Sequence, residues 1–447
     1  MLLHFALMSG QEVAVEALPE DIVDDVLNRA QDALNVVLVS MISSSGALLN
    51  LTRSLEDEGV QDGDRLIVVV DKSDPPRQWH SNSFILAALK KDGQLVVWGG
   101  EAAGASCCAV PEDLNSVEFV CANSGAIAAV TDGRVITWGE ANLGGDSAAV
   151  RHQLVDVCSV CSSAYAFAAL KHDGSVVCWG DSNAGGDSTA VQEQLHSVRQ
   201  ISAATWAFAA IKGDGSVVTW GNDRKGGDSS SVQDQLMNVK SICASSWAFA
   251  ALRADGRAIT WGVANKGGDS RSVQEHLHNV LQLRATSWAF AALKSDGTVL
   301  SWGDPESGGD CRKVQHRLTS VCQLCACAEA FAALTRLGQV VTWGHVLCQR
   351  SSSDGSLNDV QRMSASSRAF AALKKDGTVV TWGDRQKGGS SGTMEPELVD
   401  IHQICGSSWA FAALRGDGQV ITWGDPRNGG DSSAVSHCLS DIVDLFA

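Results

Sequence analysis

Residues 206–221 read Trp206-Ala-Phe-Ala-Ala-Ile-Lys-Gly-Asp-Gly-Ser-Val-Val-Thr-Trp-Gly221. The run from Trp206 to Ile211 is apolar at every position, which is typical of a strand that is buried on both faces. The pair Asp214-Gly215 predicts a hairpin turn, because glycine readily adopts the positive φ that such turns require. Residues 216–220 return as another strand, so the segment predicts a tight antiparallel hairpin.

The residues on either side complete a unit of about forty residues. Val198–Ala203 precedes the hairpin and alternates in polarity, which predicts a first short strand. Gly226-Gly227-Asp228 marks a further turn, and residues 231–236 form a brief connector of about one helical turn. Short antiparallel strands in a unit of this length are typical of a propeller blade, whereas helical solenoids show a 3.6-residue period.

This unit recurs along most of the chain. The dipeptide Trp-Gly occurs nine times, and its tryptophans are Trp98, Trp138, Trp179, Trp220, Trp261, Trp302, Trp343, Trp382 and Trp423. The successive differences between these numbers are 40, 41, 41, 41, 41, 41, 39 and 41, so the period is nearly constant. A fixed period is the signature of a repeat architecture, and we therefore predict an all-β propeller of about nine short blades. A seven- or eight-bladed ring with extra repeats and an open β-solenoid are alternatives.

One more strand-like segment follows the last repeat. Residues 442–447 read Ile442-Val-Asp-Leu-Phe-Ala447 and match the first strand of a unit. The first unit opens near Phe84–Leu89 and is preceded by the poor strand Pro76–Ser81. We therefore expect the C-terminal segment to pair beside Phe84–Leu89 and close the ring, which would remove an exposed sheet edge.

The repeats resemble the regulator of chromosome condensation repeat family, whose blades read Ala-Cys-Gly-x-x-His, an apolar strand, then Asp-Gly-x-Val-x-x-Trp-Gly. The matching residues here are Ile404-Cys-Gly-Ser-Ser-Trp409-Ala-Phe-Ala-Ala-Leu414 and Asp417-Gly-Gln-Val-Ile-Thr-Trp-Gly424. The resemblance covers residues 82–447 and implies a propeller that binds a protein on one face. Two departures are a Trp in place of the family's usual His and units that are shorter than the family's, whose usual ring has seven blades.

Residues 1–71 predict a separate α+β domain. Residues 1–8 and 12–17 predict a hairpin, and Asp21 stands where it would cap a helix. The apolar face of that helix is Val23, Val26, Leu27 and Ala30, and Leu66–Val70 predicts a final buried strand. This order resembles the β-grasp of ubiquitin, with residues 72–81 as a linker to the propeller at 82–447.

The ubiquitin resemblance implies a built-in domain rather than a conjugated modifier, because the domain runs from Val70 into the linker without a free Gly-Gly end. Residues 1–71 contain no lysine, so chains cannot be built on this domain as they are on ubiquitin. It places Met8 and Val69 at two positions of the apolar patch that ubiquitin receptors grip. The central isoleucine of that patch falls at or near Ser43. Docking to ubiquitin or proteasome machinery is what the resemblance implies for this domain.

Composition narrows the function classes. The formal net charge is −17, and residues 1–75 hold 14 Asp and Glu against 4 Lys and Arg. Phosphate backbones repel such a surface, so no nucleic-acid partner is expected. The N-terminus lacks a basic signal-peptide region and no run approaches 18 apolar residues, so we expect a cytoplasmic or nuclear protein without a membrane segment.

No residue set indicates catalysis, a cofactor or a metal. Histidines occupy no repeated register, and the common nucleophile, zincin and phosphate-loop motifs are absent from the sequence. The spacing Cys158-x-x-Cys161 resembles a zinc motif, as does Cys322-x-x-Cys325. However, one register of the predicted first strand holds Cys121, Cys161, Cys243, Cys325 and Cys405, which indicates a small packing residue in each blade.

One register varies from repeat to repeat and is the candidate partner-binding site. It begins the second strand and reads Phe84, Gly125, Tyr165, Trp206, Trp247, Trp288, Glu329, Arg368 and Trp409. The family resemblance implies that this end of the strands lies on a partner-binding face. A row of tryptophans beside Tyr165 would suit a protein partner. The alternative is that these tryptophans pack against the next blade.

The leading hypothesis is a non-enzymatic adaptor, in which the propeller binds a protein and the ubiquitin-like domain connects it to ubiquitin or proteasome machinery. The alternative is guanine-nucleotide exchange on a small Ran-like GTPase, which is the founding activity of the repeat family. That activity uses a wedge that projects from one blade, and the short, nearly constant spacing of the repeats leaves no room for such an insertion.

Overall fold

A computed structural model describes residues 1–6, 12–21, 23, 26–27, 29–30, 38–43, 49, 53–70, 85–90, 95–99, 117–348, 357–439 and 442–446. Nearly all regular structure in these residues is β-strand, connected by turns and short 3-10 helices. In the part of the chain so described, no helix is long and apolar enough to cross a membrane.

Nine three-stranded antiparallel sheets follow one another along residues 85–446. Blade 1 contains β31 (Ile442–Phe446), β5 (Ile85–Lys90) and β6 (Leu95–Gly99). Blades 2 to 5 contain β7 (Val117–Ala122), β8 (Ala126–Thr131) and β9 (Arg134–Gly139); β10 (Val157–Ser162), β11 (Ala166–Lys171) and β12 (Val176–Gly180); β13 (Val198–Ala203), β14 (Ala207–Lys212) and β15 (Val217–Gly221); and β16 (Val239–Ala244), β17 (Ala248–Arg253) and β18 (Ala258–Gly262).

The remaining blades repeat this pattern. Blades 6 to 9 contain β19 (Val280–Ala285), β20 (Ala289–Lys294) and β21 (Val299–Gly303); β22 (Val321–Ala326), β23 (Ala330–Thr335) and β24 (Val340–Gly344); β25 (Val360–Ala365), β26 (Ala369–Lys374) and β27 (Val379–Gly383); and β28 (Ile401–Gly406), β29 (Ala410–Arg415) and β30 (Val420–Gly424). The predicted unit at residues 198–236 is thus confirmed, and its connector is the 3-10 helix η7 (Ser230–Gln235).

The hydrophobic core lies between blades rather than inside any one of them. In blade 4, Phe208 is fully buried and stacks on Trp220 with ring centroids 5.2 Å apart. The Trp220 Nε1–H donates to the carbonyl of Gly185 in blade 3 at 3.1 Å. Ala207, Ala209 and Ala210 surround Phe208 in β14, because the neighbouring blades approach closely on both faces. Each Phe–Trp pair therefore joins its blade to the preceding one.

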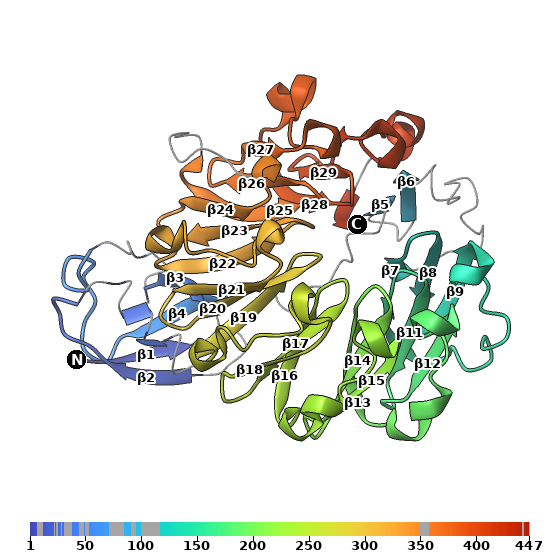
Figure 1. Cartoon of the computed structure of the whole chain (residues 1–447). Helices are drawn as coiled ribbons and strands as arrows, with labels where there is room; N and C mark the ends of the chain where they lie inside the picture. Colours follow the sequence, from blue (N-terminus) through green and yellow to red (C-terminus); the bar gives the residue numbers. More distant parts are fainter. Residues whose placement is uncertain are drawn as a thin grey trace.

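The ring closes through the ends of the repeat region. Strand β31 pairs antiparallel with β5, which confirms the predicted pairing of the C-terminal segment beside Phe84–Leu89. The Trp98 Nε1–H donates to the carbonyl of Gly429 at 3.1 Å, which is the bond that joins other neighbouring blades. Figure 1 shows the blades succeeding one another from teal to red, with the C-terminus beside β5. An open solenoid would leave these ends apart, so the chain forms a β-propeller of nine blades.

The N-terminal residues form a separate four-stranded sheet of β1 (Leu2–Ala6), β2 (Glu12–Glu16), β3 (Leu38–Ile42) and β4 (Arg65–Val70), in the order β2-β1-β4-β3. Strands β1 and β2 form the predicted hairpin, and β1 runs parallel to β4. The four apolar residues predicted to face the core from a helix are fully buried. The ubiquitin-like identity of this sheet stays a prediction.

Candidate protein-interaction face

The variable register lies on one end of the blades, in the turn between the first and second strands. A chain of backbone hydrogen bonds links these turns from Ser124 in blade 2 to Ser408 in blade 9. In it, the residue just before each register position donates to its counterpart in the next blade, as Ser246 N–H does to the Ser287 carbonyl at 2.9 Å. The register residues of neighbouring blades consequently stand side by side.

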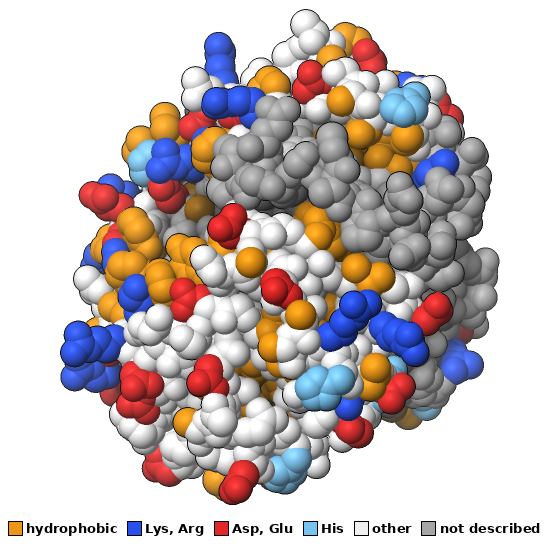
Figure 2. Space-filling model, turned by 90° about the vertical axis from the view of Figure 1, so that its right-hand side faces the viewer, with side chains coloured by type: hydrophobic (Ala, Val, Ile, Leu, Met, Phe, Trp, Pro, Cys, Tyr) orange, Lys and Arg blue, Asp and Glu red, His pale blue; other side chains and the backbone are white. Residues whose placement is uncertain are grey.

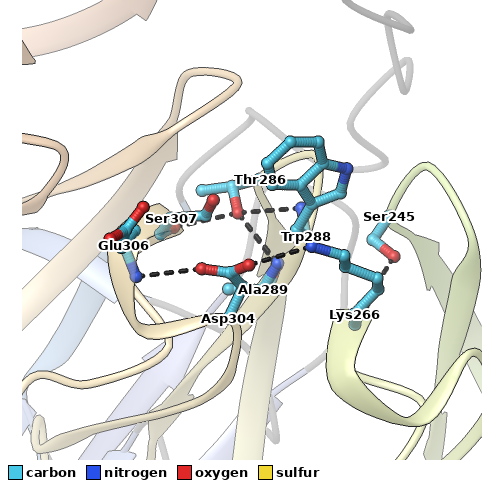
Figure 3. Close-up of polar contacts among 8 residues, drawn as sticks. All are labelled: Ser245, Lys266, Thr286, Trp288, Ala289, Asp304, Glu306 and Ser307. Carbon is cyan, nitrogen blue, oxygen red and sulfur yellow. Dashed lines mark hydrogen bonds and ion pairs between the residues drawn. The ribbon is translucent and has the colours of Figure 1, made fainter.

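Each turn is also fixed by a side chain within its own blade. Thr286 Oγ accepts from the Ala289 N–H at 2.9 Å and donates to the Ser307 carbonyl at 3.0 Å, which holds the turn that carries Trp288 (Figure 3). A serine does the same work in blade 5, where Ser245 Oγ donates to the Lys266 carbonyl. Small hydroxyl residues therefore set the orientation of this end of the strands.

The register side chains are more exposed than the buried tryptophans of the Trp-Gly register, although Tyr165 and Trp206 also pack against the core between blades 3 and 4. Trp288 is 38% exposed, and the register side chains in blades 3, 4, 5, 7, 8 and 9 are half-buried. By contrast, Trp302 in the Trp-Gly register of blade 6 is 2% exposed. The partly exposed residues are Tyr165, Trp206, Trp247, Trp288, Glu329, Arg368 and Trp409. Each of these side chains has a surface open to solvent, and its role in binding a partner stays a prediction.

Lysines lie over the tryptophan rings. Lys225 Nζ is 3.9 Å from the ring centre of Trp206 and 5.5 Å from that of Trp247. Tyr165 packs against the same Trp206, with ring centroids 4.6 Å apart. These contacts join blades 3, 4 and 5 into one row, in which Tyr165 packs directly on Trp206 and Lys225 lies between Trp206 and Trp247.

The row continues into blade 6. Lys266 Nζ lies 3.9 Å from the ring centre of Trp288 and pairs with Asp304 Oδ2 at 2.9 Å (Figure 3). The ammonium group is thus held between an indole face and a carboxylate. We call Tyr165, Trp206, Lys225, Trp247, Lys266 and Trp288 the cation–aromatic arc.

Charged side chains replace the aromatic ones in blades 7 and 8. Arg368 pairs with Glu329 at 2.6 Å, and His345 Nδ1 lies 3.8 Å from the other Glu329 oxygen. The hydrogen bond to Glu329 raises the pKa of Arg368 above its ordinary value. Trp409 restores the pattern in blade 9, where Lys387 Nζ lies 2.8 Å from its ring centre. The ion pair therefore separates the arc from Trp409.

Sequence reasoning missed two groups of residues on this face. The lysines Lys225, Lys266 and Lys387 end the 3-10 helices η6 (Asp223–Lys225), η8 (Ala264–Lys266) and η14 (Arg385–Lys387). Each stands in the blade before one with a register tryptophan, so aligning the repeats would have revealed them.

The second group is apolar. Val346 and Leu347 in η12 (Val346–Cys348) of blade 7 are 74% and 52% exposed. The corresponding positions in blade 6 are Pro305 and Glu306. Blade 7 thus presents two branched apolar side chains at this end of the strands, where blade 6 does not; we call Val346 and Leu347 the apolar tip. No repeated pattern marked it, because it departs from the repeat.

Of the two residues predicted for the apolar patch of the N-terminal sheet, the structure describes only Val69. Met8 lies outside the described residues. Val69 belongs to β4 and pairs opposite Ser40 in β3, while Ser43 follows the end of β3. Binding through this patch stays a prediction.

The cysteines pack and hydrogen-bond inside the blades. Cys158 and Cys322 of the two zinc-like motifs donate to the carbonyls of Leu170 and Leu334, both at 3.4 Å. Burial raises the pKa of the Cys121 thiol to about 11 and that of Cys325 to about 12, so both stay protonated at neutral pH. Among the described residues, no three His, Cys, Asp or Glu side chains come together as a metal site.

No family model matches the chain, and no curated protein matches its sequence. Similar solved structures include the ectodomain of the receptor kinase CR4 from Physcomitrella patens, with 16% identity, a TM-score of 0.38 and coverage of 59% of this chain and 71% of that one. Prp20p from Saccharomyces cerevisiae, described in its complex with Kap60 as yeast RCC1, is 16% identical, with a TM-score of 0.35 and coverage of 76% and 80%. At such scores, the assignment as a propeller rests on the sheets and inter-blade bonds above.

Proposed function

We propose that this protein is a non-enzymatic adaptor whose propeller binds a protein partner through the cation–aromatic arc. The observation that supports this best is the exposure of Trp288, whose side chain is 38% exposed. Its turn is held by the hydrogen bond from the Ala289 N–H to Thr286 Oγ, and Lys266 covers one face of its ring. A rigid aromatic anchor binds with little loss of conformational entropy, which is typical of protein-interaction hot spots.

The charge distribution agrees with a protein partner better than with a nucleic acid. Lys and Arg side chains are interspersed with Asp and Glu over the described part of the face in Figure 2, without a continuous basic area there. Phosphate backbones select such basic areas, whereas interfaces between proteins combine aromatic anchors with mixed charges.

The N-terminal sheet supplies the second part of the proposal. We infer that residues 1–71 are a ubiquitin-like domain that connects the bound partner to ubiquitin or proteasome machinery in the cytoplasm or nucleus. The hairpin of β1 and β2, the α-helical residues among 23–30 and the strand β4 that runs parallel to β1 support this inference. Binding of the full-length protein to purified proteasomes tests it, with Met8→Ala/Val69→Ala expected to weaken the interaction.

Affinity purification with tagged full-length protein tests the propeller arm. Replacing both Trp206 and Trp288 by Ala should release a partner that the wild-type protein retains, with a loss of about 2 kcal/mol, or roughly thirtyfold in Kd, for a central anchor. Met237→Ala is the matched control, because Met237 is 56% exposed but precedes β16 at the opposite end of the blade. The same set of partners on wild-type and double-variant beads would contradict the proposal.

The adaptor proposal also predicts that the protein has no catalytic activity of its own. Purified protein should not accelerate nucleotide release from a Ran-like GTPase and should form no ubiquitin thioester. Either activity, if a point mutation abolished it, would overturn the adaptor proposal in favour of an enzyme or an exchange factor.

A further inference from the structure

A hydroxyl side chain fastens the same turn in most of the described blades. Its oxygen donates to the carbonyl of the residue 21 positions later, at distances between 2.7 and 3.4 Å. The donors are Ser163, Ser245, Thr286, Ser366 and Ser407, and the acceptors are Ala184, Lys266, Ser307, Lys387 and Asn428. The bond ties the short 3-10 helix after the third strand to the beginning of the second strand.

Blade 7 replaces this bond by two thiols. Cys327 occupies the hydroxyl position and Cys348 stands 21 positions later, with their Sγ atoms 3.7 Å apart. Both side chains are buried, at 4% and 0% exposure. Cys348 Sγ also donates to the carbonyl of Arg368 in blade 8 at 3.3 Å. The two cysteines thus occur in the same repeat, where their sulfur atoms are in contact.

The sequence that follows Cys348 also differs from that of the neighbouring blades. Blades 2 to 6, 8 and 9 continue from the 3-10 helix into Gly-Gly, as in blade 6, where the Gly309 N–H donates to the Asp304 carbonyl. In blade 7 the residues after Cys348 are Gln349-Arg350. The thiol pair thus stands where η12 lacks the diglycine of its neighbours and carries the exposed Val346–Leu347 tip.

We propose that Cys327 and Cys348 are a redox site, in which a peroxide converts the thiol pair to a disulfide that fastens η12 to blade 7. A disulfide bond is about 2.05 Å long. The two Sγ atoms are already in van der Waals contact at 3.7 Å, so they need only approach each other to form the bond. One thiol is oxidised by hydrogen peroxide to a sulfenic acid and releases one water. The second thiol then displaces the hydroxyl group as another water, so two S–H bonds are replaced by one S–S bond.

The reduced pair is the resting state. Burial, together with the hydrogen bond to Cys348, raises the pKa of Cys327 well above its ordinary value, so the sulfur stays protonated at neutral pH. Only the thiolate reacts, and therefore oxidation has to follow a local opening of the short η12 turn. The reaction should accordingly be slow at neutral pH and faster as the pH rises.

Oxidation has a defined consequence for the neighbouring blade. A disulfide has no S–H group, so the bond from Cys348 to the Arg368 carbonyl is lost. The guanidinium of the same Arg368 pairs with Glu329 between the arc and Trp409. The redox state of the pair is thus coupled to the Arg368–Glu329 ion pair on the interaction face. This coupling does not depend on whether the cation–aromatic arc binds the partner proposed above.

Peptide mapping of the full-length protein tests the site. Reduced protein is treated with hydrogen peroxide under native conditions, blocked with N-ethylmaleimide and digested with trypsin, which cuts after Arg317, Arg336 and Arg350. We expect peptides 318–336 and 337–350 linked with the loss of two hydrogens, and released by dithiothreitol. The linked yield should rise between pH 7 and pH 9.

Matched variants identify the sulfurs. Cys327→Ser installs the residue found at this position in blades 3, 5, 8 and 9, so it should fold normally and form no linked peptide. Cys325→Ser, in the same tryptic peptide, should keep the link. The proposal is overturned if the folded wild-type protein yields no linked peptides while its other thiols are oxidised. It is equally overturned if Cys327→Ser retains the link.

Discussion

At the scale of single residues, the repeats contain two kinds of tryptophan that should respond differently to truncation. Trp302 is buried, stacks on Phe290 and donates to the Gly267 carbonyl. Trp302→Ala should therefore leave a cavity and cost about 3–5 kcal/mol of unfolding free energy. Trp288→Ala removes an exposed ring and its contact with Lys266, and should cost about 0.5–1 kcal/mol. Urea unfolding measures both, and equal losses would mean that Trp288 is a core residue.

A second residue-scale prediction concerns acid. Hydrogen bonds from the Arg271 and Arg312 side chains lower the pKa of Asp269 and of Asp310 to about 2 from an ordinary value of 3.8. The ionised carboxylates thus stabilise the fold above pH 3.8, and this contribution is lost as the pH falls toward about 2. Because both pairs are exposed, the effect is small. Asp269→Asn/Asp310→Asn should flatten the fall in Tm over this window, and an unchanged slope would contradict the assignment.

At the scale of elements, the closing strand is the most informative test. Deleting residues 442–447 removes β31 from the sheet of blade 1 and leaves β5 with an open edge. We expect a fall in Tm of several degrees or more, measured by calorimetry. A control that lacks only Ala447 should melt like the intact chain. An unchanged Tm for the longer deletion would mean that β31 does not hold the ring closed.

The elements also show how far sequence reasoning reaches. The run at residues 206–211 predicted β14 because a strand packed on both faces tolerates no polar residue, and Gly215, with φ 79°, confirms the turn after it. The closing of the ring followed from Ile442–Phe446 because that segment repeats a first strand. Which lysine covers which indole could not be predicted within one repeat, since Lys266 covers Trp288 and Lys387 covers Trp409 from the preceding blade. The exposed Val346 and Leu347 of η12 were not predicted, because they depart from the repeat pattern on which the sequence analysis relied.

At the scale of the whole molecule, the linker predicted at residues 72–81, which lies outside the described residues, implies two independently folded parts. Cleavage there by a specific protease should leave a soluble propeller and a soluble N-terminal sheet, because each has its own buried core. Two melting transitions that match those of the intact chain are expected. An aggregated propeller after cleavage would show that the N-terminal sheet covers part of its core.

The bond between Trp98 and Gly429 has a consequence for how such a ring changes in evolution. Because the junction between the last and first blades uses the same indole-to-carbonyl bond as six described junctions inside the ring, closure requires no specialised interface. Duplication or loss of one whole repeat that carries this bond would leave the same donor and acceptor at each new junction. We therefore expect ring size to vary by whole repeats, while the pairing of β31 with β5 remains the contact that closes the ring.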